Sequence, residues 1–228
     1  MNLDNIEALG KYRIIDISQP VSETTACFPG DTPFSLKVKV SYESSHVLNL
    51  SAITMSPHVG THADAPVHVR GTMDSAQGVT AESIGTVPLE PFVGPATVID
   101  LSPHRGAIER IHVEKILSER KTPPRRVLFK TLTKIRYHVF ENAYAFLTPD
   151  LIDMLAESGV CLIGLDTPSV DHIDSKGLES HHKLLEKKIN WLENLDLTEA
   201  YGKDYFLMAL PIKLMQAEAA PVRAVLLD

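Results

Sequence analysis

The chain has 228 residues, of which 44% are hydrophobic and 22% charged, and its formal net charge is −7. This length predicts one large domain or two small ones, and the composition excludes a disordered tail, a collagen-like repeat and a coiled coil. The acidic balance makes nucleic acid a poor partner, and no apolar run is long enough for a membrane span.

Strands dominate the first half of the predicted secondary structure. Residues 34–40 alternate apolar and polar side chains, as a half-buried strand does. Helical periodicity first appears over residues 110–119. The other predicted strands of this half cover residues 12–17, 47–55, 96–101 and 126–130.

A second helix is predicted over residues 149–158. Thr148 is a candidate N-cap, Pro149 stands at the first helical position, and Gly159 follows the end. Beyond it we expect a buried strand over 160–166, a short helix over 179–187, and strands over 205–212 and 222–227. The predicted fold class is α/β, a compact single domain over residues 1–228 with a mixed β-sheet core and few helices.

The densest group of reactive side chains is His58, His62, Asp64 and His68. All four positions are even, so they would share one face of an extended chain. An extended chain would also separate His58 from His62 by about 13 Å. One ion holds nitrogen ligands at about 2.0–2.1 Å, so a shared metal requires the chain to fold back. Gly60 is the residue that permits such a fold.

Imidazole and carboxylate together suit zinc, manganese or iron better than calcium or magnesium. A set of surface histidines on a loop is the alternative interpretation. Three histidines and one aspartate within eleven residues favour the metal site. His68 has a distinct alternative role, because a histidine beside a metal-bound water can exchange a proton near neutral pH.

A second candidate group contains His181 and Glu193, twelve residues apart. In one straight helix they would lie about 18 Å apart along the axis, so they can share a site only if the helix ends between them. A third candidate, residues 166–171, follows a predicted buried strand. A turn capped by Asp and Ser and a functional loop are equally good interpretations of that segment.

The segment HVGTHADAPVH at residues 58–68 resembles the HxGTHxDxPxH motif of the metal-dependent cyclase-like hydrolases. The resemblance covers residues 13–228, and it is weak over 132–147. DTPSVD at 166–171, DSK at 174–176 and PVRAV at 221–225 narrow it to the bacterial kynurenine formamidases, or arylformamidases.

This resemblance implies two divalent metal ions per chain, usually Zn²⁺, with Mn²⁺ as an alternative. The implied ligands are His58, His62, Asp64, His181 and Glu193, with Asp64 and Glu193 bridging the two ions. It also implies a cyclase-like swivelling β/β/α fold and a homodimer.

The same resemblance assigns His68 as the general acid/base, with N-formyl-L-kynurenine as substrate. Phe28 stands where the family commonly has a tryptophan that lines the substrate pocket. Phenylalanine keeps the aromatic face but lacks the indole donor. The implied reaction gives L-kynurenine and formate, as in tryptophan catabolism by the kynurenine pathway.

Two alternative functions stay open at this point. A sister hydrolase of the same family would act on another aryl or cyclic amide such as isatin, and Phe28 keeps that alternative open. A non-catalytic metal-binding protein belongs to a different class. Two cysteines and no secretory signal in the first twenty residues favour a cytoplasmic protein, with residues 1–10 as a candidate flexible extension.

Overall fold

A nine-stranded mixed sheet forms the centre of the computed structural model, which describes residues 12–74 and 78–228. Its strands are β1 (Ile14–Asp16), β4 (His62–Asp64), β7 (Val93–Asp100), β9 (Arg126–Lys130), β11 (Leu162–Leu165), β12 (Asn190–Glu193), β13 (Asp204–Met208), β14 (Ala219–Pro221) and β15 (Val225–Leu227). The spatial order is β1-β15-β13-β7-β9-β11-β12-β4-β14. The four central strands β7, β9, β11 and β12 are parallel to one another, whereas all other pairs in the sheet, including β7 with β13 and β12 with β4, are antiparallel.

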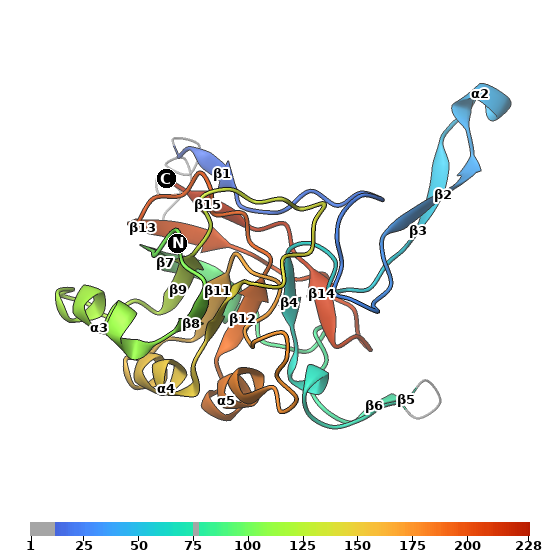
Figure 1. Cartoon of the computed structure of the whole chain (residues 1–228). Coiled ribbons are helices and arrows are strands. Elements are labelled where there is room, and N and C mark those ends of the chain that lie inside the picture. The colour runs from blue at the N-terminus through green and yellow to red at the C-terminus, as the bar shows by residue number, and fades with distance from the viewer. Residues whose placement is uncertain (1–11, 75–77) are drawn as a thin grey trace, which may run out of the picture.

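Three helices, α3 (Arg110–Ser118), α4 (Pro149–Glu157) and α5 (Glu179–Lys187), lie together along one side of the sheet (Figure 1). Val127 and Phe129 of β9 belong to the apolar core that includes α4 and α5 side chains. Leu128, between them, belongs to the second core on the other face. Because β9 is buried on both faces, its three central residues are all apolar and do not alternate with polar ones.

The predicted helix boundaries are confirmed where capping chemistry defines them. The Thr148 hydroxyl accepts the backbone N–H of Leu151, Pro149 opens α4, and Gly159 adopts a left-handed φ of +85°. α5 covers the predicted residues 179–187 and is capped by Lys188, which has a left-handed φ of 56°. The predicted helix 110–119 is α3.

A hairpin of β2 (Ser35–Val40) and β3 (Leu50–Thr54) projects from the body, with α2 (Tyr42–Ser45) at its tip (Figure 1). Both strands are predicted, but the expectation of a half-buried strand over 34–40 is wrong. Val38 is 60% exposed and Ile53 is 62% exposed. Alternation gives a strand two different faces, but it does not determine whether another part of the chain covers the apolar one.

The remaining described elements are short. They are β5 (Met73–Asp74), β6 (Gly78–Val79), β8 (Gly106–Ile108), β10 (Ala145–Leu147) and the 3₁₀ helices Pro66–His68 and Glu90–Phe92. The strand predicted over 205–212 ends at Met208, because beyond it Pro211 makes an isolated bridge to Val222. No described helix has the length and apolar character of a bilayer span. The predicted α/β class with a mixed sheet is confirmed, and the predicted extension 1–10 lies outside the described residues.

Candidate metal centre

The histidine-rich segment folds back at Gly60, as its sequence predicts. Gly60 has a φ of +71°, and the turn brings the His58 and His62 ring centroids within 4.9 Å. A Cβ atom at Gly60 would lie 2.6 Å from Cγ2 of Val21, so glycine is required by space as well as by conformation. Only His62–Asp64, which forms β4, is a regular strand within this segment of the chain.

The second candidate group reaches the same place from two different elements. His181 is on α5, which ends at Lys187, and Glu193 is on β12, which starts at Asn190. The predicted end of the helix between them is therefore confirmed. β12 pairs antiparallel with β4 and places Glu193 directly opposite His62.

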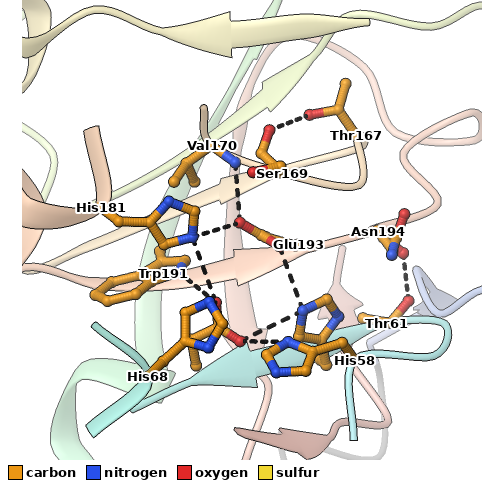
Figure 2. Close-up of polar contacts among 12 residues, drawn as sticks. His58, Thr61, His68, Thr167, Ser169, Val170, His181, Trp191, Glu193 and Asn194 are labelled. Atoms are coloured by element: carbon orange, nitrogen blue, oxygen red, sulfur yellow. Dashed lines mark hydrogen bonds and ion pairs between the residues drawn. The ribbon is translucent and has the colours of Figure 1, made fainter. Parts of the chain in front are cut away.

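The five residues with implied ligand roles lie around one centre, and Figure 2 shows His58, His181 and Glu193 among them. His62 Nε2 lies 3.4 Å from Asp64 Oδ1 and 3.3 Å from Glu193 Oε2. His181 Nε2 lies 3.7 Å from Asp64 Oδ2 and 3.5 Å from Glu193 Oε1. His58 Nδ1 lies 3.1 Å from Asp64 Oδ1.

Two of the imidazole rings are held so that Nε2 faces the carboxylates. His62 Nδ1 lies 2.9 Å from the Gly60 carbonyl oxygen, and His181 Nδ1 lies 2.6 Å from Asp171 Oδ2. Partners of this kind fix the tautomer and the orientation of metal-binding histidines. Within the described part of the chain, His62 Nε2 and Asp64 Oδ1 are buried without a hydrogen-bond partner. A divalent metal would satisfy both atoms, and the nitrogen and oxygen donors suit zinc or manganese.

The two carboxylates are also oriented by hydrogen bonds. The Trp191 indole N–H donates to Asp64 Oδ2 at 2.9 Å, and the Val170 backbone N–H donates to Glu193 Oε1 at 2.9 Å. Sequence reasoning missed Trp191 in this role. Its signal was available, because Trp191 and Glu193 are two residues apart in an extended segment and so share a face of β12.

Asp171 acts both as a capping residue and as part of the candidate site, the two interpretations that the sequence left open for residues 166–171. Its carboxylate caps the start of α5 by accepting the backbone N–H groups of Ser180 and His181 at 2.8 and 3.0 Å. It also orients the His181 ring. Glu218, whose Oε1 lies 3.5 Å from His58 Nε2, carries no signal in the sequence because only the fold brings it to the site.

The electrostatic environment separates His68 from its neighbours. Burial lowers the pKa of His58, but the carboxylates of Asp64 and Glu218 outweigh it and raise the pKa to about 11. For His181 burial is likewise outweighed by Asp171 and Asp64, and its pKa rises to about 10. The pKa of His68 is lowered, chiefly by burial and also by the neighbouring His58 and His181. Burial and the two histidines together outweigh the opposite effect of the carboxylates.

A cavity of about 490 Å³ opens from this centre, and His58, His68, His181 and Glu193 line its inner end. Phe28 lines the same cavity and packs edge-to-face on Phe140, with ring centroids 5.3 Å apart. Phe28 is 40% exposed, so its ring is available to a ligand. The cavity can hold an aromatic ring beside a cluster that could bind metal and beside His68, whose pKa is lowered chiefly by burial.

Tyr144 is a further polar residue of the cavity that sequence reasoning missed. It is 4% exposed, and its hydroxyl has no hydrogen-bond partner within residues 12–74 and 78–228. Burial, reinforced by the Glu193 carboxylate, raises the pKa of this hydroxyl.

A comparison of the sequence with models of known protein families shows which family the chain belongs to. The Cyclase family model matches residues 15–172, which carry the histidine-rich motif and most of the central sheet. The chain belongs to the Cyclase family. Two curated proteins named kynurenine formamidase resemble it over nearly their whole length. The one from Bordetella avium (strain 197N) is 44% identical and covers 94% of this chain and 97% of its own. The one from Paracidovorax citrulli (strain AAC00-1) is 43% identical and covers 92% of this chain and 94% of its own.

Solved structures show the Cyclase-family fold of the chain. Isatin hydrolase A from Labrenzia aggregata, bound to benzyl benzoate, matches with a TM-score of 0.83 and 24% identity, covering 99% of this chain and 98% of its own. Isatin hydrolase A from Ralstonia solanacearum matches with a TM-score of 0.81 and 24% identity, covering 99% and 95%. At this level of identity the likeness concerns the fold and not the substrate.

Proposed function

We propose that this chain is an arylformamidase that hydrolyses N-formyl-L-kynurenine to L-kynurenine and formate. The observation that carries the proposal is the buried His/Asp/Glu centre at the inner end of an aromatic-lined cavity. The relatives named kynurenine formamidase, 42–44% identical over most of the chain, support the substrate. In this proposal the chain is a cytoplasmic enzyme of tryptophan catabolism through the kynurenine pathway.

The metal centre of this proposal holds two divalent ions, Zn²⁺ or alternatively Mn²⁺. His58, His62 and Asp64 would hold one ion, His181 and Glu193 would hold the other, and the Asp64 and Glu193 carboxylates would contribute to both. Such ions supply two effects when bound, a lower pKa for a coordinated water and polarisation of a carbonyl oxygen. Support comes from the orphaned atoms of His62 and Asp64 and from the hydrogen bonds that orient His62, His181 and the two carboxylates.

His68 moves the proton in the proposed reaction. Its ring lies between the His58 and His181 rings, with centroids 4.7 and 5.4 Å away, and it lines the cavity. Because its pKa is lowered, the ring is neutral at pH 7 and can accept a proton from the attacking water. The water oxygen bonds to the formyl carbon, the C–N bond breaks, and His68 returns the proton to the departing aryl amine.

Phe28 binds the aryl ring of the substrate. Its contact with Phe140 holds the ring edge-to-face and leaves part of it exposed to the cavity. Offset or edge-to-face contacts between aromatic groups contribute about 0.5–1.5 kcal/mol beyond the area that they bury. We therefore expect Phe28→Ala to raise KM for aryl formamides by about tenfold, and Phe28→Trp to retain activity.

Turnover of N-formyl-L-kynurenine, followed by kynurenine absorbance with and without a chelator, tests the function. We expect turnover that is lost with the chelator and restored by zinc, and far slower turnover of isatin. His68→Ala should lose most of the rate while keeping its metal, and His172→Ala, a half-exposed histidine outside the cavity lining, should keep both. A metal-loaded protein that is inert on formamides but hydrolyses isatin would overturn the substrate assignment.

The exposed hairpin supports a homodimer. Leu36, Val38, Leu50 and Ile53 are between 47% and 62% exposed on two strands that no described element covers. An isolated two-stranded hairpin is marginal in water, and an exposed apolar strand invites pairing. Sedimentation should give twice the chain mass for wild type and for Lys37→Ala, and the chain mass for Val38→Lys. A monomeric wild type would contradict the dimer.

A further inference from the structure

The cavity has a charged outer end that the proposed chemistry does not use. Its inner end is formed by His181 and Glu193, which are 3% exposed. The lining also includes Arg105, Arg136 and Glu141, whose side chains reach solvent. We call the part of the cavity lined by the buried residues its inner end and the part lined by the exposed charged residues its outer end.

Arg105 stands out among these charged residues because it has no ionic partner. It lies in the loop before β8, and its guanidinium donates to the backbone carbonyl of Ala143. Within the described part of the chain no carboxylate lies within 4.0 Å of it. Arg136, in contrast, is paired with Glu141. The Ala143 contact holds the guanidinium at the cavity and leaves its other N–H groups free.

An unpaired guanidinium held at a cavity wall is a receptor for a carboxylate. Its planar donors match the two oxygens of a carboxylate, and such charge-assisted contacts are stronger than neutral ones. Glu141 lines the same cavity, and beside the oxygen that contacts Arg136 it has a second carboxylate oxygen that can accept from an ammonium group. The outer end therefore presents both charges that an α-amino acid requires.

We propose that Arg105 and Glu141 form the subsite for the zwitterionic end of an aryl formamide that carries an α-amino acid, with Arg105 binding its carboxylate. The inference rests on the proposed function, since it places the formamide at the metal end. Phe28 and Phe140 lie along the same cavity and take the aryl ring between the two ends. Arg105 thereby selects charged substrates over neutral formanilides and isatin.

Binding of two products tests the subsite without turnover. L-Kynurenine carries the amino-acid group, and 2′-aminoacetophenone is the same aryl ketone without it. In titrations of the metal-loaded protein we expect Arg105→Ala to weaken L-kynurenine binding by about 10- to 100-fold and 2′-aminoacetophenone binding by less than about twofold. Arg105→Lys should recover part of the loss, because it keeps the charge but not the planar fork.

Arg125→Ala is the matched control, since it removes the same exposed charge outside the cavity lining. It should bind both ligands as wild type does. Glu141→Gln should weaken the binding of L-kynurenine and leave the binding of 2′-aminoacetophenone unchanged. If Arg105→Ala weakens both ligands equally, or neither, the subsite is refuted.

Turnover separates this inference from the proposed function. Wild type should prefer N-formyl-L-kynurenine to 2′-formamidoacetophenone in kcat/KM, and Arg105→Ala should remove that preference while hydrolysing the neutral amide normally. Equal kcat/KM for both amides in wild type would refute the subsite and leave the formamidase function standing. Arg105-dependent binding of L-kynurenine by a protein that hydrolyses neither amide would refute the function and support the subsite.

Discussion

Asp171 offers a sharp test of the proposed metal centre, because it contacts the proposed ligand His181 and none of the other four proposed ligands. Its Oδ2 lies 2.6 Å from His181 Nδ1 and accepts the His181 backbone N–H at 3.0 Å, while Oδ1 accepts the Ser180 N–H at 2.8 Å. Asp171→Asn has nearly the same shape but replaces one acceptor oxygen by a donor NH₂ group. One amide orientation leaves His181 Nδ1 without an acceptor, and the other leaves Ser180 N–H unpaired.

The expected magnitude follows from the role of this contact. Loss of the partner that orients a metal-binding histidine costs about 10- to 100-fold in metal affinity. That range corresponds to about 1.4–2.7 kcal/mol of binding free energy. The pKa of His181 should also fall from about 10, because the charged partner that raises it is gone. Turnover at limiting metal should fall by the same factor as the affinity.

Competition with a chelator of known zinc affinity measures the effect. Asp174→Asn is the matched control, since it removes the same charge from the same loop at a side chain that is 85% exposed. Thermal melts of the metal-free proteins separate a loss of metal affinity from a loss of folding. If Asp171→Asn is folded and binds zinc as tightly as wild type, the argument that Asp171 orients His181 as a ligand is wrong.

Two further predictions concern stability. In the metal-free protein the pKa values of His58 and His181 are raised from 6.5 to about 11 and about 10, so the stability they contribute is complete below pH 6.5 and is lost as pH rises through those values. The melting temperature of the chelated protein should therefore fall as pH rises from 6.5 through these pKa values, and a melting temperature independent of pH would contradict the argument. Zinc binding at neutral pH should release protons into the buffer. Gly60→Ala should cost about 2–4 kcal/mol, because it combines a φ of +71° with a 2.6 Å contact to Val21. Gly159→Ala, with a φ of +85° and no atom within 4 Å, should cost only about 1 kcal/mol, and equal losses in denaturant titrations would refute the packing argument.

Interactions between residues close in the sequence were sufficient to predict several parts of this structure. The motif at residues 58–68 and Gly60 lie within eleven residues, so the sequence predicts that the chain folds back there if His58 and His62 share a metal. Thr148, Pro149 and Gly159 define the ends of α4 through capping contacts that involve only neighbouring residues. The apolar residues 127–129 predict a strand over 126–130, and β9 covers these residues.

Only the tertiary structure decided how these parts meet. Glu193 faces His62 because β12 pairs with β4, and Trp191 reaches Asp64 across 127 positions of sequence. Such pairings follow from burying both faces of the sheet, which no local pattern specifies. The same limit explains the exposed hairpin β2–β3, since alternation cannot tell a face covered by the same chain from one left open. Arg105 likewise has no signal in the sequence, because its role depends on a cavity that the folded chain builds around it.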